Sequence, residues 1–467
     1  MITIAGFQLS EGLRDAKFIF IATLVLIAFV INAFSYSGYF REDRESFSRS
    51  ERTTSAMLEQ NSGSLRDLSN YAQKVVKPPS ALAFLADGGM RKLPDTWSVN
   101  AFIFRDPERT QRGNRYMPVI GSFDWSFIVG TLMTLLSILV SYSAICGEKQ
   151  SGTLRMILSS RVSRMSLFFG KYLGLLAATV IPFLLGGLLS VVILYTNNAL
   201  PLTEAVLQTL GWVVCLSILC ISIFILFGMA VSSMVSRPAV ALVVALIGWI
   251  AVVIVVPGIA RLIAERLAPV RANFEIEREI EAAIEAVVAR QPNEASDIPG
   301  DEYRDTYPLR AQMLNERLTA TQRVIVNSNE ERIHQAVLLN IVTHISPTGL
   351  LNSSLQELSG TGVFGYETLM RNARRYQQQL HDFTVEKDST DPDSWHLVSS
   401  SGSNSHTGFL SAKPVSLSEV PRWNRLWLQE GLAIERAWPF WQLVLLIMVN
   451  LQMAIIAFIA LLCYDPR

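Results

Sequence analysis

Residues 238–260 read PAVALVVALIGWIAVVIVVPGIA and contain no charged side chain. A helix needs about 20 apolar residues to cross the hydrocarbon core of a bilayer, so this run predicts a membrane span. Five further runs have similar length and composition: 18–36, 123–145, 172–195, 210–235 and 438–464. The sequence therefore predicts an all-α membrane protein with six transmembrane helices, not a large soluble enzyme.

The overall composition agrees with this class. Half of the 467 residues are hydrophobic and 17% are charged, against about 25% in an average soluble domain. Lys and Arg together number 40, as do Asp and Glu, so no excess of positive charge suggests a nucleic-acid partner. We expect no disulfide and no Cys-rich metal site outside the membrane, because every cysteine lies in or beside an apolar run: Cys146, Cys215, Cys220 and Cys463.

The short loops predict the orientation of the spans, because cytoplasmic loops carry an excess of Lys and Arg. Loop 146–171 has a single acid, Glu148, and five basic residues: Lys149, Arg155, Arg161, Arg164 and Lys171. The short loop 196–209 has Glu204 and no basic residue. We therefore expect loop 146–171 and both termini in the cytoplasm.

This orientation divides the chain into five parts. Residues 1–36 hold an amphipathic N-terminal helix and the first span, and 37–122 form a first extracytoplasmic region. Residues 123–260 hold four spans, 261–437 form a second extracytoplasmic region, and 438–467 hold the last span and a short cytoplasmic end. Few residues remain on the cytoplasmic side, so no nucleotide-binding domain fits there.

Helical patterns dominate the second extracytoplasmic region. Apolar residues recur at helical spacing in 274–288, 309–345 and 366–385, and Ser346-Pro347 should end the second of these helices. We expect both extracytoplasmic regions to form one mainly helical domain, either a packed structural unit or a docking surface for a partner protein. The headgroup region is the expected place of four tryptophans: Trp423, Trp427, Trp438 and Trp441.

The loop between the second and third spans contains GEKQSGTLRMILSSR, residues 147–161. Ser151 or Thr153 can cap the start of a short helix. Leu154, Ile157 and Leu158 then share one face of it, with Arg155 on another. So short a helix is unstable alone in water, so its apolar face should dock in a groove of a partner protein. A helix lying on the membrane surface, with arginines reaching to the headgroups, is the alternative.

The longer run GEKQSGTLRMILSSRVSRMSLFFGKYLG resembles the signature of ABC-2-type transporter permeases. The matching positions are Glu148, Gly152, Thr153, Leu154, Leu158, Ser163, Arg164, Gly170 and Lys171. The N-terminal FQLSEGLRDAKFIFIATLVL resembles the amphipathic helix of the same family. KPPSALAFLADGG and ISPTGLLNSSLQELSGTG resemble a subgroup with a large extracytoplasmic domain before the last span.

The resemblance implies a permease that works with a pair of cytoplasmic ABC ATPase subunits and a second permease, identical or paralogous. ATP would be bound by the partner, and no cofactor is expected on this chain, which has no G-x-x-x-x-G-K-[ST] motif. The residues implied in coupling to the ATPase are Glu148, Gly152, Thr153, Leu154, Arg155, Ile157, Leu158, Arg164 and Lys171.

Two functions remain open at this level. The chain could export a lipid-like, peptide or hydrophobic substrate, or it could transmit motion to an extracytoplasmic partner without moving cargo. A receptor without an ATPase is a third, weaker alternative. Enzyme chemistry has little support, because H-E-x-x-H and G-x-S-x-G are absent and the histidines are scattered along the chain.

The predicted orientation can be tested by cysteine labelling. With Ser401→Cys, a membrane-impermeant thiol reagent should label intact spheroplasts, because residue 401 is expected outside. With Ser160→Cys, labelling should require opening of the cytoplasmic side. The reverse pattern would show that the orientation is inverted.

Overall fold

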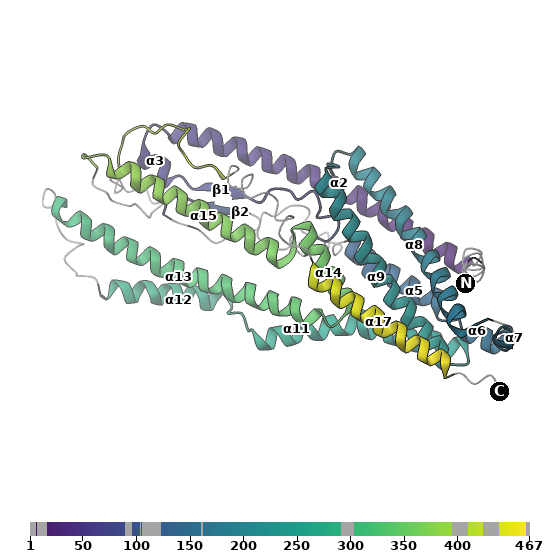
Figure 1. The fold of residues 1–467 in the computed structure, drawn as a ribbon. Helices are drawn as coiled ribbons and strands as arrows, with labels where there is room; N and C mark the ends of the chain where they lie inside the picture. Colours follow the sequence, from purple (N-terminus) through teal and green to yellow (C-terminus); the bar gives the residue numbers. More distant parts are fainter. Residues whose placement is uncertain are drawn as a thin grey trace.

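The computed structural model describes residues 6, 16–88, 96–102, 104, 123–159, 162–290, 303–394, 410–423 and 439–463. The predicted N-terminal amphipathic helix and Trp427 and Trp438 therefore lie outside the described residues. Six helices are long and apolar enough to cross a membrane: Phe18–Asn61, Trp125–Ser151, Arg164–Thr196, Glu204–Met234, Pro238–Leu267 and Phe440–Leu462. The prediction of an all-α protein with six spans is confirmed, with the spans forming a bundle and the remaining helices projecting from one end of it (Figure 1).

The first span does not stop at the membrane. Helix α2 runs without a break over Ala16–Asn61, so the charged stretch after residue 36 continues the span. At about 1.5 Å per residue this helix is roughly 70 Å long. It crosses the bundle and then lies along the projecting part of the molecule (Figure 1).

Helix α9 (Glu204–Met234) is the most buried of the six spans. It packs against α5 (Thr134–Ser141), α8 (Arg164–Thr196) and α17 (Phe440–Leu462). Its close approach to α5 depends on Gly228, where an added Cβ would lie 1.9 Å from Ser141 Oγ. Polar side chains also join these helices. Ser222 Oγ lies 2.7 Å from Tyr172 Oη and donates to Asn450 Oδ1 at 2.6 Å, so one hydrogen-bonded chain links α8, α9 and α17.

The fifth span contains a π-helical turn. It runs through α10 (Pro238–Ile250), η3 (Ala251–Val255) and α11 (Val256–Leu267). A short break follows, and then come the antiparallel helices α12 (Asn273–Val288) and α13 (Tyr303–Thr343), close to the predicted 274–288 and 309–345. Arg271 in the break pairs with Glu279 of α12 and, at 2.9 Å, with Glu331 of α13.

The chain then turns back into the bundle, which the sequence pattern did not predict. Ser346 Oγ donates to Val252 O in the π-helical turn at 2.9 Å, and Pro347 begins helix α14 (Pro347–Ser359). A π-helical turn disturbs the regular hydrogen-bond pattern, and a side chain from another element can use its carbonyls. Val252 lies near the middle of the helical stretch Pro238–Leu267, so Ser346 and Pro347 lie beside the middle of the fifth candidate span.

Helix α14 shares one core with the spans, through Leu350, Leu351, Leu355 and Leu358. The segment 80–87 of the first long loop lies against it. Ser80 Oγ donates to Ser359 O at 3.1 Å, and Thr361 Oγ1 donates to Ala86 O at 2.6 Å. We call residues 80–87 and 347–361 the plate. It joins the two long loops at the end of the bundle from which the other helices project (Figure 1).

The projecting part, which we call the distal domain, has its own core. Helix α3 (Leu65–Asn70), the antiparallel strands β1 (Gln73–Val76) and β2 (Thr96–Val99), and helix α15 (Gly362–Ser389) lie beside the outer half of α2 (Figure 1). Trp97 and Tyr376 are fully buried there. Trp423 is buried in the same core, where its Nε1 donates to Val76 O at 3.1 Å, so its expected place among the headgroups is wrong.

The hydrogen bond between Thr361 and Ala86 in the plate should contribute measurably to the stability of the protein. Thr361→Val removes a buried donor to Ala86 O and should lower the free energy of unfolding of the detergent-solubilised protein by about 1–3 kcal/mol. Thr53→Val is the control, because its hydroxyl bonds only within the exposed face of α2. Equal stability of the two variants would contradict the importance of this contact.

Candidate functional site

The family-like loop forms an elbow of two short helices at the opposite end of the bundle from the plate. Helix α6 (Cys146–Ser151) ends at Gly152, whose φ of 76° is left-handed and favours glycine, and helix α7 (Thr153–Ser159) follows (Figure 1). The hydroxyls of Ser151 and Thr153 lie 2.8 Å apart, and both donate to Glu148 O. They close the last turn of α6, and the short helix predicted from the sequence follows as α7.

The start of the elbow is fastened to α9. Ser232 Oγ accepts hydrogen bonds from the backbone N–H groups of Ile145 and Cys146, both at 3.0 Å. The Lys149 ammonium donates to Ser233 O. Backbone N–H groups at the start of α6 are thus satisfied by a side chain of a neighbouring span.

An ion pair fastens the elbow to α8. Lys171 Nζ lies 2.6 Å from Glu148 Oε1 and also donates to Ala144 O at 2.7 Å. The Lys171 side chain is 3% exposed and that of Glu148 is 27% exposed. The second carboxylate oxygen of Glu148 is buried and accepts no hydrogen bond within the described part of the chain. The partner of Glu148 is therefore the Lys171 of its own chain.

The apolar face of α7 points into the protein. Leu154 is completely buried in the core of the bundle, and Ile157 is partly buried against the same core. The expectation that Leu154 fills a groove of a partner is therefore wrong, because the bundle itself provides the groove. The Leu158 side chain lies outside the described side chains.

The outward face of the elbow has a different composition. Thr153 and Arg155 are exposed, and Met156 is 71% exposed although its side chain is apolar. An exposed methionine can adapt to varied partner surfaces, because its chain is unbranched and polarisable. A partner protein that approaches the elbow would contact this exposed face of α7.

Arg164, the first residue of α8, connects that helix to the last span. Its guanidinium donates to Leu462 O at 2.8 Å, among the carbonyls that end α17. A cation near the C-terminus of a helix is favourable, because free carbonyls accept its hydrogen bonds. The sequence-predicted residues therefore gather at one end of the bundle, where Glu148, Lys171 and Arg164 tie α6, α8 and α17 together.

Sequence reasoning missed Ser232 and the carbonyl of Ala144. The Ser232-Ser233 pair at the end of an apolar run was the available signal, since hydroxyls there can satisfy a neighbouring backbone. Elsewhere, His344 Nε2 lies 2.8 Å from Ser353 Oγ, and burial lowers the pKa of His344. The described residues contain no group of His, Cys, Asp and Glu side chains arranged to hold a metal ion.

The sequence model of the ABC-2 family transporter protein matches residues 2–384. The chain belongs to this family. A search of curated proteins found no match. The match covers five of the spans, the elbow and the plate, and it ends before α17. Membership makes the chain a membrane subunit that is not itself catalytic, and it implies an ABC ATPase partner.

The buried ion pair predicts a non-additive mutant cycle. Lys171→Met leaves the partly buried Glu148 without its cation, and Glu148→Gln leaves the buried Lys171 without its anion. Either change should cost about 3 kcal/mol of unfolding free energy. The double variant should recover part of this loss, because no unpaired charge remains buried. Additive losses in the denaturation of the purified chain would contradict a direct coupling between the two side chains.

Proposed function

We propose that this chain is the permease subunit of an ATP-driven exporter. A separate pair of ABC ATPase subunits hydrolyses ATP, and a second permease, identical or paralogous, completes the membrane part. The substrate class that we propose is lipid-like, peptide or hydrophobic. The observation that carries this proposal is the elbow, which is bonded to α8 and α9 and exposes an adaptable face.

The proposed orientation places the elbow in the cytoplasm of a bacterium and the chain in its inner membrane. Five basic residues of loop 146–171 support this side, and the loop 196–209 at the other end has none. The ATPase would then meet the elbow from the cytoplasm, and the plate and the distal domain would lie outside.

The bonds around the elbow support its role as the coupling element. Coupling needs a part that contacts the ATPase and moves the spans with it. The contact face that we propose is Thr153, Arg155 and Met156, on the outside of α7. Leu154 and Ile157 would act from the inside, because they seat α7 on the bundle. Glu148, Gly152, Arg164 and Lys171 would pass the motion to α8 and α17.

Two neighbouring residues of α7 test this division of roles. Met156→Glu should greatly reduce recovery of the ATPase in a pull-down from native membranes, because it puts a charge into an apolar contact, while thermal unfolding stays unchanged. Leu154→Ala should lower the unfolding free energy by about 2–5 kcal/mol, because it opens a cavity in the core. If Met156→Glu retains the ATPase and full ATP-dependent activity, the outward face of α7 is not the docking surface.

A second function is favoured by a separate observation. Helix α2 is continuous from the bundle into the distal domain, so a tilt of its inner half moves its outer half as well. Such a rod suits a permease that transmits motion to an extracytoplasmic partner without passing cargo. Export alone does not require an unbroken helix at this point.

A helix break separates the two functions. Arg44→Pro removes a backbone hydrogen bond in the exposed outer part of α2 and kinks the helix; Arg44→Ala is the matched control. Motion transmission predicts that Arg44→Pro abolishes ATP-dependent activity while the ATPase stays bound. Export predicts that substrate efflux from proteoliposomes continues in both variants.

A further inference from the structure

The last span, α17, is fixed to the bundle along one face. This face packs against α9 and α8, and Leu446 and Leu461 are buried in it. Asn450 belongs to the same face, because its Nδ2 donates to Leu219 O at 2.9 Å and its Oδ1 accepts from Ser222. Figure 1 shows α17 on the outside of the bundle, with no labelled helix in front of it. The opposite face of α17 is therefore open to the surroundings of the bundle.

This open face carries a regular row of exposed side chains. We call the row the outer face of α17, and its members follow one another at alternating spacings of four and three residues: Trp441, Leu445, Met448, Gln452, Ile455 and Ile459. Such a spacing is the heptad repeat by which two helices pack against each other along their whole length. All members of the row are apolar except Gln452.

Gln452 lies in the middle of the span. At about 1.5 Å per residue it is about 18 Å from Phe440 at one end of α17 and about 15 Å from Leu462 at the other. Two residues along a helix differ in direction by about 200°, so Gln452 points away from α9 whereas Asn450 points toward it. The Gln452 side chain is exposed and makes no hydrogen bond within the described part of the chain.

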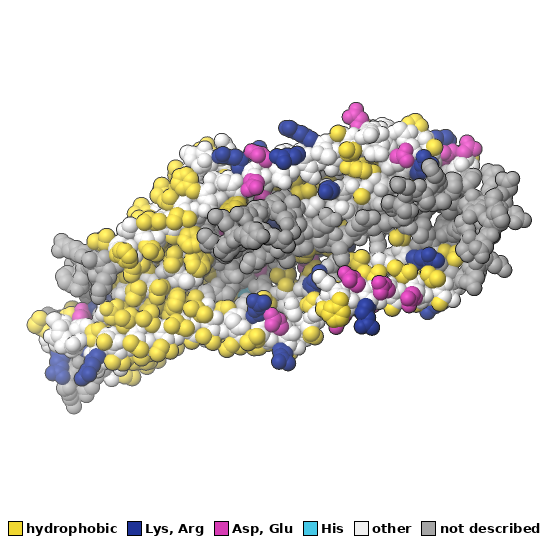
Figure 2. Space-filling view, turned by 180° about the vertical axis from the view of Figure 1, so that it is seen from behind, with side chains coloured by type: hydrophobic (Ala, Val, Ile, Leu, Met, Phe, Trp, Pro, Cys, Tyr) yellow, Lys and Arg dark blue, Asp and Glu magenta, His cyan; other side chains and the backbone are white. Residues whose placement is uncertain are grey.

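Lipid tails cannot satisfy this amide. The surface of the bundle drawn in Figure 2 is mainly hydrophobic, while Lys, Arg, Asp and Glu gather at its end and over the projecting helices. Such a surface suits hydrocarbon, whereas an amide without a hydrogen bond is unfavourable there. Polar side chains in membrane spans accordingly tend to face other helices and bond across to them. The exposure of Gln452 therefore indicates a neighbouring helix on the outer face.

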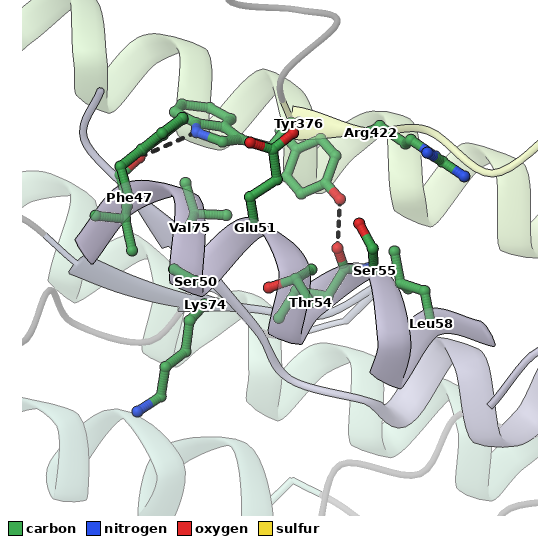
Figure 3. A pocket seen from close by; sticks show the side chains of 13 residues that line it. Phe47, Ser50, Glu51, Thr54, Ser55, Leu58, Lys74, Val75, Tyr376 and Arg422 are labelled. Carbon is green, nitrogen blue, oxygen red and sulfur yellow. Dashed lines mark hydrogen bonds between the residues drawn. The ribbon is translucent and has the colours of Figure 1, made fainter. Parts of the chain in front are cut away.

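Comparable side chains of this protein find their partners within the chain. In the distal domain, Tyr376 Oη donates to Gln73 Oε1 beside a cavity of about 60 Å³ (Figure 3). At the start of α17, Gln442 Nε2 donates to Glu357 Oε1 of the plate at 2.8 Å. The described part of the chain offers Gln452 no such group. Its partner has to come from another molecule.

A second copy of the same chain supplies a matching group. Copies of one chain enter the membrane in the same orientation, so their α17 helices are parallel and hold Gln452 at the same depth. An amide has both an acceptor oxygen and donor hydrogens, so two amides that face each other can bond. A two-fold axis brings the same residue of both copies together in this way.

The place of Gln452 in the repeat supports the same occupant. In heptad notation Gln452 takes an a position, with Leu445 and Ile459 at the a positions before and after it. A single polar residue at an a position fixes the register and the number of helices that pack together. An uninterrupted apolar row with one central amide is therefore typical of a helix that pairs in register with an identical helix.

We propose that the outer face of α17 is an interface between two copies of this chain. The two α17 helices pack in parallel, and Gln452 is hydrogen-bonded to Gln452 of the partner subunit across the two-fold axis. The contact needs no ATPase, so the proposal does not rest on the proposed transport function. Its test likewise uses no transport or ATPase measurement.

Cysteine crosslinking locates the interface. The chain without its native cysteines is reconstituted alone in liposomes and oxidised briefly with copper phenanthroline. Ile455→Cys lies on the outer face and should give a crosslinked dimer. Ile447→Cys is the matched control, because both isoleucines are 49% exposed but Ile447 lies about a quarter turn away from the outer face. Ile447→Cys should give little dimer.

A second substitution in the Ile455→Cys chain tests the amide. The crosslinked fraction at increasing dilution with lipid gives the dissociation constant of the dimer. Gln452→Leu should weaken the dimer by about threefold to thirtyfold, because a hydrogen bond between membrane helices is lost. Gln452→Asn keeps an amide and should weaken it less. Thermal unfolding of Gln452→Leu should match that of the parent chain, since Gln452 has no bond within it.

Three results would overturn the proposal. One is the absence of an Ile455→Cys dimer when the folded chain is reconstituted alone, which would leave lipid or a different membrane protein on the outer face. Another is equal crosslinking of Ile447→Cys and Ile455→Cys, which would indicate random collisions. The last is a dimer that folded Gln452→Leu leaves unchanged.

Discussion

The ion pair between Glu148 and Lys171 is the interaction on which the position of the elbow depends. A short loop helix has no stability of its own, so it keeps a fixed position only if the bundle holds it. Lys171 does this from the first turns of α8, because its ammonium binds both the Glu148 carboxylate and the Ala144 carbonyl. Ser232 holds the other side, so a shift of the elbow would either move α8 and α9 or break these bonds.

Polar contacts also join the spans to one another. Breaking hydrogen bonds in a hydrocarbon setting is unfavourable, so helices joined by polar contacts tend to move together. Ser222 joins α9 to Tyr172 of α8 and Asn450 of α17 near the middle of the bundle. Cys220, on the same stretch of α9, lies 4.0 Å from the Pro347 carbonyl at the tip of α14. Helix α9 therefore contacts both the elbow and the plate.

The sequence predicted the spans, the long helices and the place of the elbow, because these follow from apolar length, periodicity and a local motif. It could not predict which way Leu154 points, since an apolar face looks the same whether it fits the chain's own bundle or a partner. The prediction for Trp423 failed for a similar reason. A tryptophan that precedes a span in the sequence can lie among the lipid headgroups or in the core of a domain, and the sequence does not distinguish the two. Helix α14 was missed because its burial depends on Val252 and residues 80–87, which are far away in sequence.

Helix α14 connects the bundle to both the first long loop and the distal domain. Its tip is bonded to the π-helical turn of the fifth span through Ser346, and its far end is bonded to the first long loop through Ser359 and Thr361. Gly360 and Gly362, both with left-handed backbones, then lead directly into α15 of the distal domain. A displacement of α9 or the fifth span must therefore either move α15 or break the buried contacts of the plate. Because α2 runs beside the same domain without interruption, the distal domain receives motion from two connections, and a relative movement between them would act on the seam between α2 and β1.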